Sequence, residues 1–159
     1  MVVFRYEPLS YMLQHGLNAL AYEAWGVLEK EFKNVAYSPN WQKYQAMEDS
    51  NDLRFVAMRN GSELVGYAAV EIYEDAHRSG IKTAYITDIY VTNKFRGYAS
   101  KLVGFIEEQA AQLGVNNLTI AERFNFEQDR GGVGRFYEFM GFYPQECLWV
   151  KPLSEIRVQ

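Results

Sequence analysis

Hydrophobic and polar residues follow two periods along this chain, one near two residues and the other near 3.6. Short runs of β-branched and aromatic residues that end at Gly, Pro, Asn or Asp are typical of β-strands. Such runs predict strands at Val2–Tyr6, Leu53–Arg59, Glu63–Tyr73, Thr83–Val91 and Asn117–Ala121, and one or two more in Tyr143–Leu153. Asn60-Gly61 is a strong signal for a hairpin turn, and Gly66 within a strand predicts a bulge or a close backbone approach.

Apolar residues at helical spacing predict four helices. They are Tyr11–Phe32, Trp41–Met47, a helix that follows Gly97 and ends near Gly114, and Val133–Met140. Ser10 is the expected N-cap of the first helix, which Gly16 or Gly26 could interrupt. Gly141 stands where the C-cap of the last helix is expected.

The rest of the chain is organised around Ile86–Ala110, where a strand, a short basic loop (Thr92–Arg96) and an amphipathic helix follow one another. The first N–H groups of a helix have no partner within it, and the helix dipole adds partial positive charge. Gly97 has no Cβ to hold a ligand away from the backbone, and Lys94 and Arg96 add full charges. The segment is therefore predicted to bind an anion.

This segment resembles motif A of the GNAT superfamily of acyl-CoA-dependent N-acyltransferases, whose signature is Arg/Gln-x-x-Gly-x-Gly/Ala. Lys94-Phe95-Arg96-Gly97-Tyr98-Ala99 fits the signature, with Lys at its first position. The resemblance implies that the cofactor is acetyl-CoA. It also implies which residues hold the pyrophosphate of coenzyme A: Lys94, Phe95, Arg96, Gly97, Tyr98, Ala99 and Ser100.

The chain departs from the family pattern in one respect, because the family usually has two more residues between the strand and the first Gly of the motif. Either the loop is shortened, or Arg96-Gly97 corresponds to an earlier Arg-Gly in the family pattern. The helical register of Ala99, Leu102 and Ile106 favours the shortened loop.

A second motif lies near the C-terminus, Val133-Gly-Arg-Phe-Tyr-Glu-Phe-Met-Gly-Phe142. It resembles the family's Ala-x-x-Phe-Tyr-x-x-x-Gly-Phe, in which the Tyr lies near the sulfur of the acyl-CoA. The resemblance implies that Tyr137 protonates the leaving thiolate, because a thiolate leaves more easily when a donor is within hydrogen-bond reach. Phe136 and Phe142 are expected to pack the helix on the sheet.

The order of elements matches the GNAT fold along essentially the whole chain. The resemblance therefore implies an α/β (α+β) fold: one domain over residues 1–159, with a central mixed, mostly antiparallel sheet of six to seven strands flanked by four helices. Up to about residue 80 the match lies only in the order of elements, whereas Tyr85–Phe142 also matches in its motifs.

Further cofactor contacts follow from the resemblance alone. In the family the pantetheine arm lies along the splayed strand much as an extra strand would. This implies backbone contacts from Ile89, Tyr90 and Val91. Asn125 and Arg130 are further candidates, although either could be a solvated loop residue.

A base must also take a proton from the attacking amine, and Asp88 and Glu122 are the candidates. Strand alternation predicts Thr87, Ile89 and Val91 on one face and Asp88 on the other. Asp is unfavourable within a strand, which favours a task for Asp88, but a carboxylate that is hydrogen-bonded to a nearby Tyr or Lys explains it equally well. Glu71 and Glu74 on the preceding strand stay open, and so does relay through water.

Aromatic residues are frequent in the first two helices and the segment between them, which in the family shape the acceptor pocket. They are Trp25, Tyr37, Trp41 and Tyr44. Each on its own fits a role in the core, but together they indicate an aromatic wall that could hold a cationic amine. His15 and His77 are not spaced as a metal pair, so no metal is expected.

Composition further limits the number of domains, the class of partner and the compartment that we expect. The 159 residues suffice for one domain, and the net charge of −4 argues against a nucleic-acid binder. The single cysteine, Cys147, excludes an internal disulfide and suits a reducing compartment. We expect a cytoplasmic protein, since there is no apolar run of membrane-spanning length and no secretory layout at the N-terminus.

The sequence thus predicts an acetyltransferase that acts on a primary amine of a small molecule or peptide, with Tyr137 as general acid. Polyamine, aminoglycoside, amino acid, peptide N-terminus and protein lysine all remain open as acceptors, as do a longer acyl chain and a homodimer. The alternative is a module that keeps the fold and binds coenzyme A or a macromolecule without catalysis. The shortened loop and Lys94 motivate that alternative.

Overall fold

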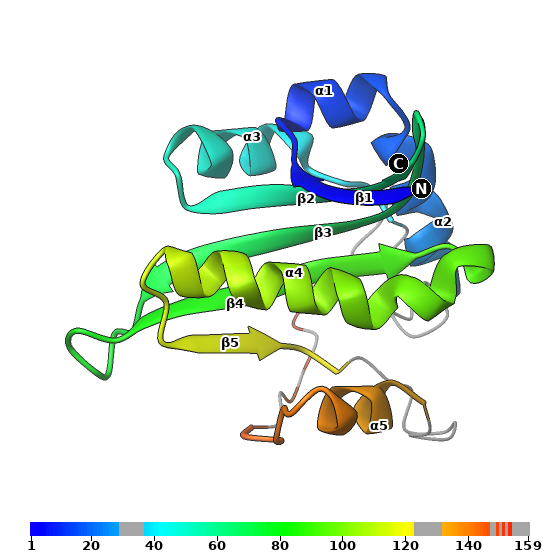
Figure 1. The fold of residues 1–159 in the computed structure, drawn as a ribbon. Coiled ribbons are helices and arrows are strands. Elements are labelled where there is room, and N and C mark those ends of the chain that lie inside the picture. The colour runs from blue at the N-terminus through cyan, green and yellow to red at the C-terminus, as the bar shows by residue number, and fades with distance from the viewer. Residues whose placement is uncertain (29–36, 123–131, 147–148, 150, 152, 154–159) are drawn as a thin grey trace.

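The computed structural model describes residues 1–28, 37–122 and 132–146, together with Trp149, Lys151 and Leu153. These residues form one five-stranded sheet in the order β1-β2-β3-β4-β5 (Figure 1). The strands are β1 (Val2–Tyr6), β2 (Leu53–Asn60), β3 (Glu63–Glu74), β4 (Lys82–Val91) and β5 (Asn117–Ile120). The first four strands pair antiparallel and β5 pairs parallel to β4, so the predicted mixed, mostly antiparallel sheet is confirmed.

The strand count differs from the prediction of six to seven, because the described part of the chain contains five strands. The expected final strands fall in Tyr143–Leu153. Residues 143–146 are not in a strand, and 147–148, 150 and 152 lie outside the described residues.

Five α-helices and one 3₁₀ helix accompany the sheet in the described residues. They are α1 (Leu9–Gln14), α2 (Leu17–Leu28), α3 (Trp41–Asp49), η1 (Asn93–Tyr98), α4 (Ala99–Gln112) and α5 (Gly132–Phe139). Gly16 divides the predicted first helix in two, since its φ of 110° is incompatible with a continuous helix. Asn40 caps α3 by accepting a hydrogen bond from the backbone N–H of Lys43.

The predicted start of the first helix is wrong. Helix α1 begins at Leu9, and Pro8 rather than Ser10 stands at the N-cap, without a side-chain cap. The backbone N–H of Leu9 donates instead to Glu48 Oε2 of α3, at 3.0 Å. A local cap motif could not reveal this partner, because it lies 39 residues away.

The helices cover both faces of the sheet. Helix α4 lies along one face, with Leu102, Ile106 and Ala110 buried against the sheet, whereas α1, α2 and α3 lie toward the other (Figure 1). Alternate residues of β2 and β3 point to opposite faces of the sheet, so one set packs under α4 and the other packs against α1–α3. No helix of the described part is long and apolar enough to cross a membrane.

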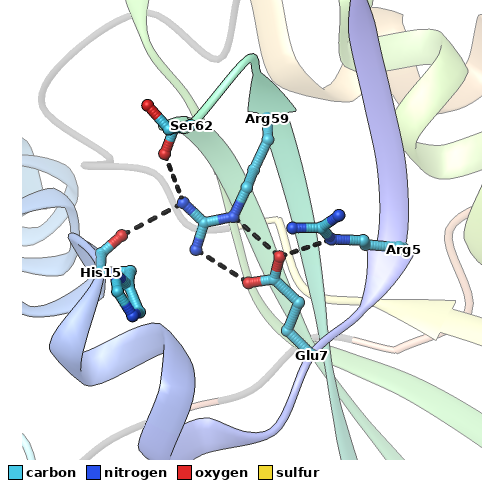
Figure 2. A network of polar contacts seen from close by, with 5 residues as sticks. All are labelled: Arg5, Glu7, His15, Arg59 and Ser62. Atoms are coloured by element: carbon cyan, nitrogen blue, oxygen red, sulfur yellow. Dashed lines mark hydrogen bonds and ion pairs between the residues drawn. The ribbon is translucent and has the colours of Figure 1, made fainter.

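A buried ion pair and its hydrogen bonds join the ends of β1 and β2 to the C-terminal end of α1 (Figure 2). Arg59 donates from Nε and Nη2 to the two carboxylate oxygens of Glu7, at 2.7 and 2.8 Å, and from Nη1 to the backbone carbonyls of His15 and Ser62. The Arg5 guanidinium adds a further bond to Glu7. Burial alone would raise the pKa of Glu7, but hydrogen bonds from Arg59 and Arg5 outweigh it and hold the pKa below its ordinary value.

The hairpin and the close approach predicted from glycines are both confirmed. Strands β2 and β3 pair across Asn60-Gly61, and the register shifts between Met58 and Arg59, beside Gly66. A Cβ at Gly66 would lie 3.0 Å from the backbone oxygen of Tyr90 and 3.3 Å from Met58 Cβ. Only glycine therefore lets β3 pass this close to the end of β4.

Candidate active site

Strand β4 has a paired half and an open half. Its pairing with β5 covers Thr83–Ile86 against Asn117–Ile120 and then stops. From Asp88 to Val91 the strand still pairs with β3, but its other edge has no strand partner among the described residues. Open N–H and C=O groups along this edge can accept an extended ligand as an additional strand would.

A β-bulge marks the boundary between the two halves. Ala69 pairs with Asp88 and Val70 with Ile86, so Thr87 is the extra residue, and its hydroxyl donates to the Ala69 carbonyl at 3.2 Å. Beyond the bulge the predicted alternation holds. Ile89 and Val91 face the core under α4, and Asp88 and Tyr90 face α1–α3.

The predicted loop of motif A is instead the 3₁₀ helix η1, and α4 begins only at Ala99. Two of the amides predicted to be unpaired are used within this turn: Phe95 N–H donates to the Thr92 carbonyl, and Ala99 N–H to the Arg96 carbonyl. The prediction of a row of free amides is therefore wrong for these two. The turn satisfies them because its residues adopt helical backbone angles before α4 starts.

The surface of this turn is nevertheless open and basic. Lys94, Arg96 and Gly97 are exposed, and a Cβ at Gly97 would meet no heavy atom within 4 Å. Tyr98, at the N-cap of α4, makes no side-chain cap, and Lys101 Nζ lies 5.2 Å from its ring centroid. The N-terminus of α4, with half-buried Ser100 in its first turn, thus combines helix dipole and positive charge.

Arg96 connects this turn to the open half of β4. Its Nε donates to the Val91 carbonyl at 3.2 Å, and its guanidinium lies 6.0 Å from the ring centroid of Tyr90. Burial, followed by the neighbouring Glu23 carboxylate, raises the pKa of Tyr90, whereas Arg96 acts in the opposite direction. The phenol is therefore neutral at physiological pH.

Tyr137 of α5 lies at the end of β5, next to the point where β5 leaves β4. Its hydroxyl donates to the carbonyl of Ala121, one residue after β5 ends, at 3.4 Å. Ring contacts with Phe136 and Phe142, at 6.0 and 5.9 Å, hold the side chain in place. The two Phe residues thus support Tyr137 by packing.

Asp88 lies among aromatic side chains from three distant parts of the chain. Its Oδ2 accepts hydrogen bonds from Tyr67 Oη at 2.6 Å and from Trp25 Nε1 at 3.3 Å. The Trp25 ring stacks on Tyr37 at 5.2 Å, with an interplanar angle of 5°. Burial, followed by the charge of Asp88, raises the pKa of both Tyr67 and Tyr37, so both phenols stay protonated.

The other candidate bases lie elsewhere. Glu122 is exposed, and its carboxylate packs on the first turn of α5, where a Cβ at Gly134 would lie 2.7 Å from Oε1. Glu71 and Glu74 pair with Tyr85 and Lys82, on the half of β4 away from the open edge. Only Asp88 of this group lies on the open half of the strand.

The chain matches the model of the acetyltransferase (GNAT) family over residues 17–142. It belongs to the GNAT acetyltransferase family. A comparison with curated proteins gives no match. Acetyl-CoA is the acyl donor of the family, so the cofactor expected from the sequence is confirmed.

Solved structures agree on the fold. Glucosamine-6-phosphate N-acetyltransferase from Arabidopsis thaliana is 17% identical with a TM-score of 0.67, and the aminoglycoside acetyltransferase HMB0005 from an uncultured soil metagenomic sample is 19% identical with 0.73. AAC(6')-Iy, in complex with the bisubstrate analog CoA-S-monomethyl-acetylneamine, is 14% identical with 0.69. Each alignment covers 97% of this chain and 99% of the other. At these identities the likeness shows the fold alone.

The GNAT chain brings part of the predicted site together. Arg96 joins the η1 turn to the open half of β4. Tyr137 lies at Ala121, one residue beyond the end of β5, whereas Asn125 and Arg130 lie outside the described residues. Sequence reasoning missed Tyr67. The only signal was a tyrosine within an apolar strand, whose buried hydroxyl requires a partner.

The residues of the predicted aromatic wall pack against one core cluster. Trp25 and Tyr37 stand beside Asp88. Trp41 donates from its indole N–H to Asn18 and contacts Tyr44 at 5.7 Å between ring centroids. In the described part of this GNAT domain, no three His, Cys, Asp or Glu side chains are grouped to hold a metal ion.

A cavity of about 310 Å³ lies at the C-terminal end of α4. It is lined by the C-terminal part of α4, the start of β5 and the turn after α5, including Ala110, Leu118 and Phe142. None of the residues of the open β4 half lines it, so we separate this cavity from the candidate active site.

Proposed function

We propose that this GNAT protein is an N-acetyltransferase that moves the acetyl group of acetyl-CoA to a primary amine. The observation that carries the proposal is the open half of β4, with a basic helix N-terminus at its end, Asp88 on one face and Tyr137 at the neighbouring strand end. A binding edge, a proton acceptor and a proton donor are the three elements that transfer to an amine requires.

The residues present fit the cofactor. Backbone groups of Ile89, Tyr90 and Val91 would hold the pantetheine arm, since no described strand pairs with this edge beyond the bulge and, within the same residues, the Val91 carbonyl has only Arg96 Nε on it. The surface from Lys94 to Ser100 would hold the diphosphate, and the empty space over Gly97 leaves room for it. When bound, acetyl-CoA supplies an acetyl group in thioester linkage, whose transfer to nitrogen yields an amide and a free thiol.

The side chains of this protein move two protons. The carboxylate of Asp88 takes one from the acceptor ammonium, which frees the nitrogen lone pair. As the C–N bond forms and the C–S bond breaks, the nitrogen loses its second proton to water and the hydroxyl of Tyr137 gives its proton to the departing sulfur. Proton exchange with water restores both side chains. We favour Asp88 over Glu122 as the base, because Glu122 packs on Gly134 at the start of α5 whereas Asp88 lies on the open strand.

Thiol release from acetyl-CoA across a panel of amines tests the activity. Tyr137→Phe is expected to lower turnover by about 10²-fold, while coenzyme A still raises the melting temperature as in the parent. Tyr143→Phe is the matched control, since Tyr143 is 79% exposed beyond α5. Turnover at the parental rate in Tyr137→Phe would show that Tyr137 is not the acid.

One observation favours the second candidate, a GNAT module without catalysis. The η1 turn uses the amides of Phe95 and Ala99 internally, which leaves fewer donors for a diphosphate. Such a module would release no thiol from acetyl-CoA with any amine, and would bind its partner independently of the cofactor. Thiol release that Arg96→Ala removes would count against it.

A further inference from the structure

We infer that Arg96 determines which thioester donors this protein accepts, because its side chain covers a backbone carbonyl of the β4 edge until a diphosphate binds the guanidinium instead. The edge then admits a pantetheine arm that carries a diphosphate and disfavours pantetheine alone. This inference rests on the proposed function, since it takes Ile89–Val91 as the place of the pantetheine arm.

The direction of the backbone groups at the end of β4 is the first support. The Thr92 N–H donates to a β3 carbonyl at 2.9 Å, and a Cβ at Gly66 of β3 would lie 3.0 Å from the Tyr90 carbonyl oxygen. Thr92 and Tyr90 therefore direct these groups toward β3. Along an antiparallel pair this direction alternates from residue to residue. The N–H and C=O groups of Ile89 and Val91 consequently point to the other edge, which β5 does not reach.

The position of Arg96 on this edge is the second support. Its Nε donates to the Val91 carbonyl at 3.2 Å, and its guanidinium lies 6.0 Å from the ring centroid of Tyr90, on the same strand. An extended ligand that pairs with this edge as a strand does uses the outward carbonyls as acceptors. The Arg96 side chain therefore lies where such a ligand would pair, and it must move before the ligand binds.

The charge of Arg96 is the third support, because it decides which ligand can move the side chain. Arg96 is exposed in the last turn of η1, beside the empty space over Gly97, and no carboxylate of the described residues forms a salt bridge with it. A hydrogen bond from a guanidinium to an anion is about twice as strong as one between neutral groups. Leaving Val91 is therefore favourable when a diphosphate is present and costs binding energy when it is absent.

Binding of cofactor fragments tests the inference without catalysis. Pantetheine and coenzyme A are titrated separately into the full chain, and the amide NMR shifts of Ile89 and Val91 report binding even at millimolar dissociation constants. In Arg96→Ala we expect pantetheine to bind about three- to tenfold more tightly, because nothing has to leave the Val91 carbonyl. Coenzyme A should bind about tenfold more weakly. A phosphate contact alone would leave pantetheine unchanged, and a structural role would weaken both ligands.

Lys94→Ala is the matched control. Lys94 is a second exposed cation of the η1 turn, and its Nζ lies 5.9 Å from the ring centroid of Phe95 within that turn. Its loss should weaken the binding of coenzyme A and leave the affinity for pantetheine at the parental value.

Inorganic diphosphate supplies the anion without the rest of the cofactor. Added to the parent, it should raise the affinity for pantetheine, whereas in Arg96→Ala it should have no such effect. The inference is overturned if Arg96→Ala binds pantetheine no more tightly than the parent, or if diphosphate does not raise the affinity of the parent.

These measurements separate the inference from the proposed function. Tighter binding of pantetheine in Arg96→Ala, with no thiol release from acetyl-CoA and any amine, supports the role of Arg96 and contradicts the acetyltransferase. Thiol release by the parent, with unchanged pantetheine binding in Arg96→Ala, supports the acetyltransferase and contradicts this role of Arg96.

Discussion

Two carboxylates, Glu7 after β1 and Asp88 on β4, are held in contrasting ways. Glu7 is buried, its side chain 4% exposed, and it is bound by the guanidinium of Arg59, which is equally buried. Asp88 is half-buried at an open strand edge, where a phenol and an indole donate to it. A carboxylate buried with a matched cation fixes elements to one another, whereas Asp88 is held by neutral donors on the half of β4 that β5 does not cover. Asp88 was a candidate in the sequence and Glu7 was not.

The largest expected effect is on catalysis at Asp88. Asp88→Asn removes the proton acceptor but keeps an oxygen for Tyr67 and Trp25, so turnover should fall by about 10²–10⁴-fold. The free energy of unfolding should change by only about 1 kcal/mol. Thiol-release kinetics and chemical denaturation measure the two effects. Parental turnover in this variant, with loss of turnover in Glu122→Gln, would assign the base to Glu122.

Glu7→Gln should have the opposite pair of effects, a large loss of stability with little change in turnover. It leaves the Arg59 guanidinium buried without its counter-charge, which should lower the free energy of unfolding by about 3–5 kcal/mol. Denaturation in urea checks the value. In the double variant Glu7→Leu/Arg59→Met, which removes both charges, much of the loss should be recovered. A double variant less stable than Glu7→Gln would contradict this account of the pair.

The pH dependence of the free energy of unfolding should report on the same Glu7–Arg59 ion pair. Because the pKa of Glu7 is lowered in the folded state, its contribution is complete above about pH 4.5, the ordinary value for a glutamate, and is lost as the pH falls through the folded-state pKa. The stability gap between the parent and Glu7→Gln should therefore be constant near neutrality and shrink in acid. Unfolding curves of both proteins across this range measure it, and a gap that stays constant in acid would refute the assignment.

A smaller effect separates two glycines, Gly66 of β3 and Gly104 of α4. Gly66→Ala places a Cβ 3.0 Å from the Tyr90 carbonyl, which should cost about 1–3 kcal/mol and weaken cofactor binding by shifting β4. Gly104→Ala in α4 is the control: its Cβ would meet nothing within 4 Å, and it should stabilise the helix by about 0.5–1 kcal/mol. Melting temperatures with and without acetyl-CoA compare them. An equal response of the two variants would show that the close approach at Gly66 does not matter.

The sequence by itself determined the elements whose signals are local. Asn60-Gly61 specified the hairpin, the spacing of Leu102, Ile106 and Ala110 specified the buried face of α4, and the strand–turn–helix order around Gly97 located the turn between β4 and α4. Each signal lies within one element or one turn, where the period of side chains or a backbone conformation allows few alternatives. The family resemblance used the same local information.

Only the tertiary structure decided the contacts between distant segments. Glu7 and Arg59 are 52 residues apart, and Trp25 and Asp88 are 63 apart. The bulge at Thr87, the 3₁₀ turn before α4 and the start of α1 at Leu9 likewise depend on packing against neighbouring strands and helices. Periodicity assigns a residue to a face of its own element but does not specify what packs against that face. For that reason the partners of both carboxylates could be assigned only once the sheet was assembled.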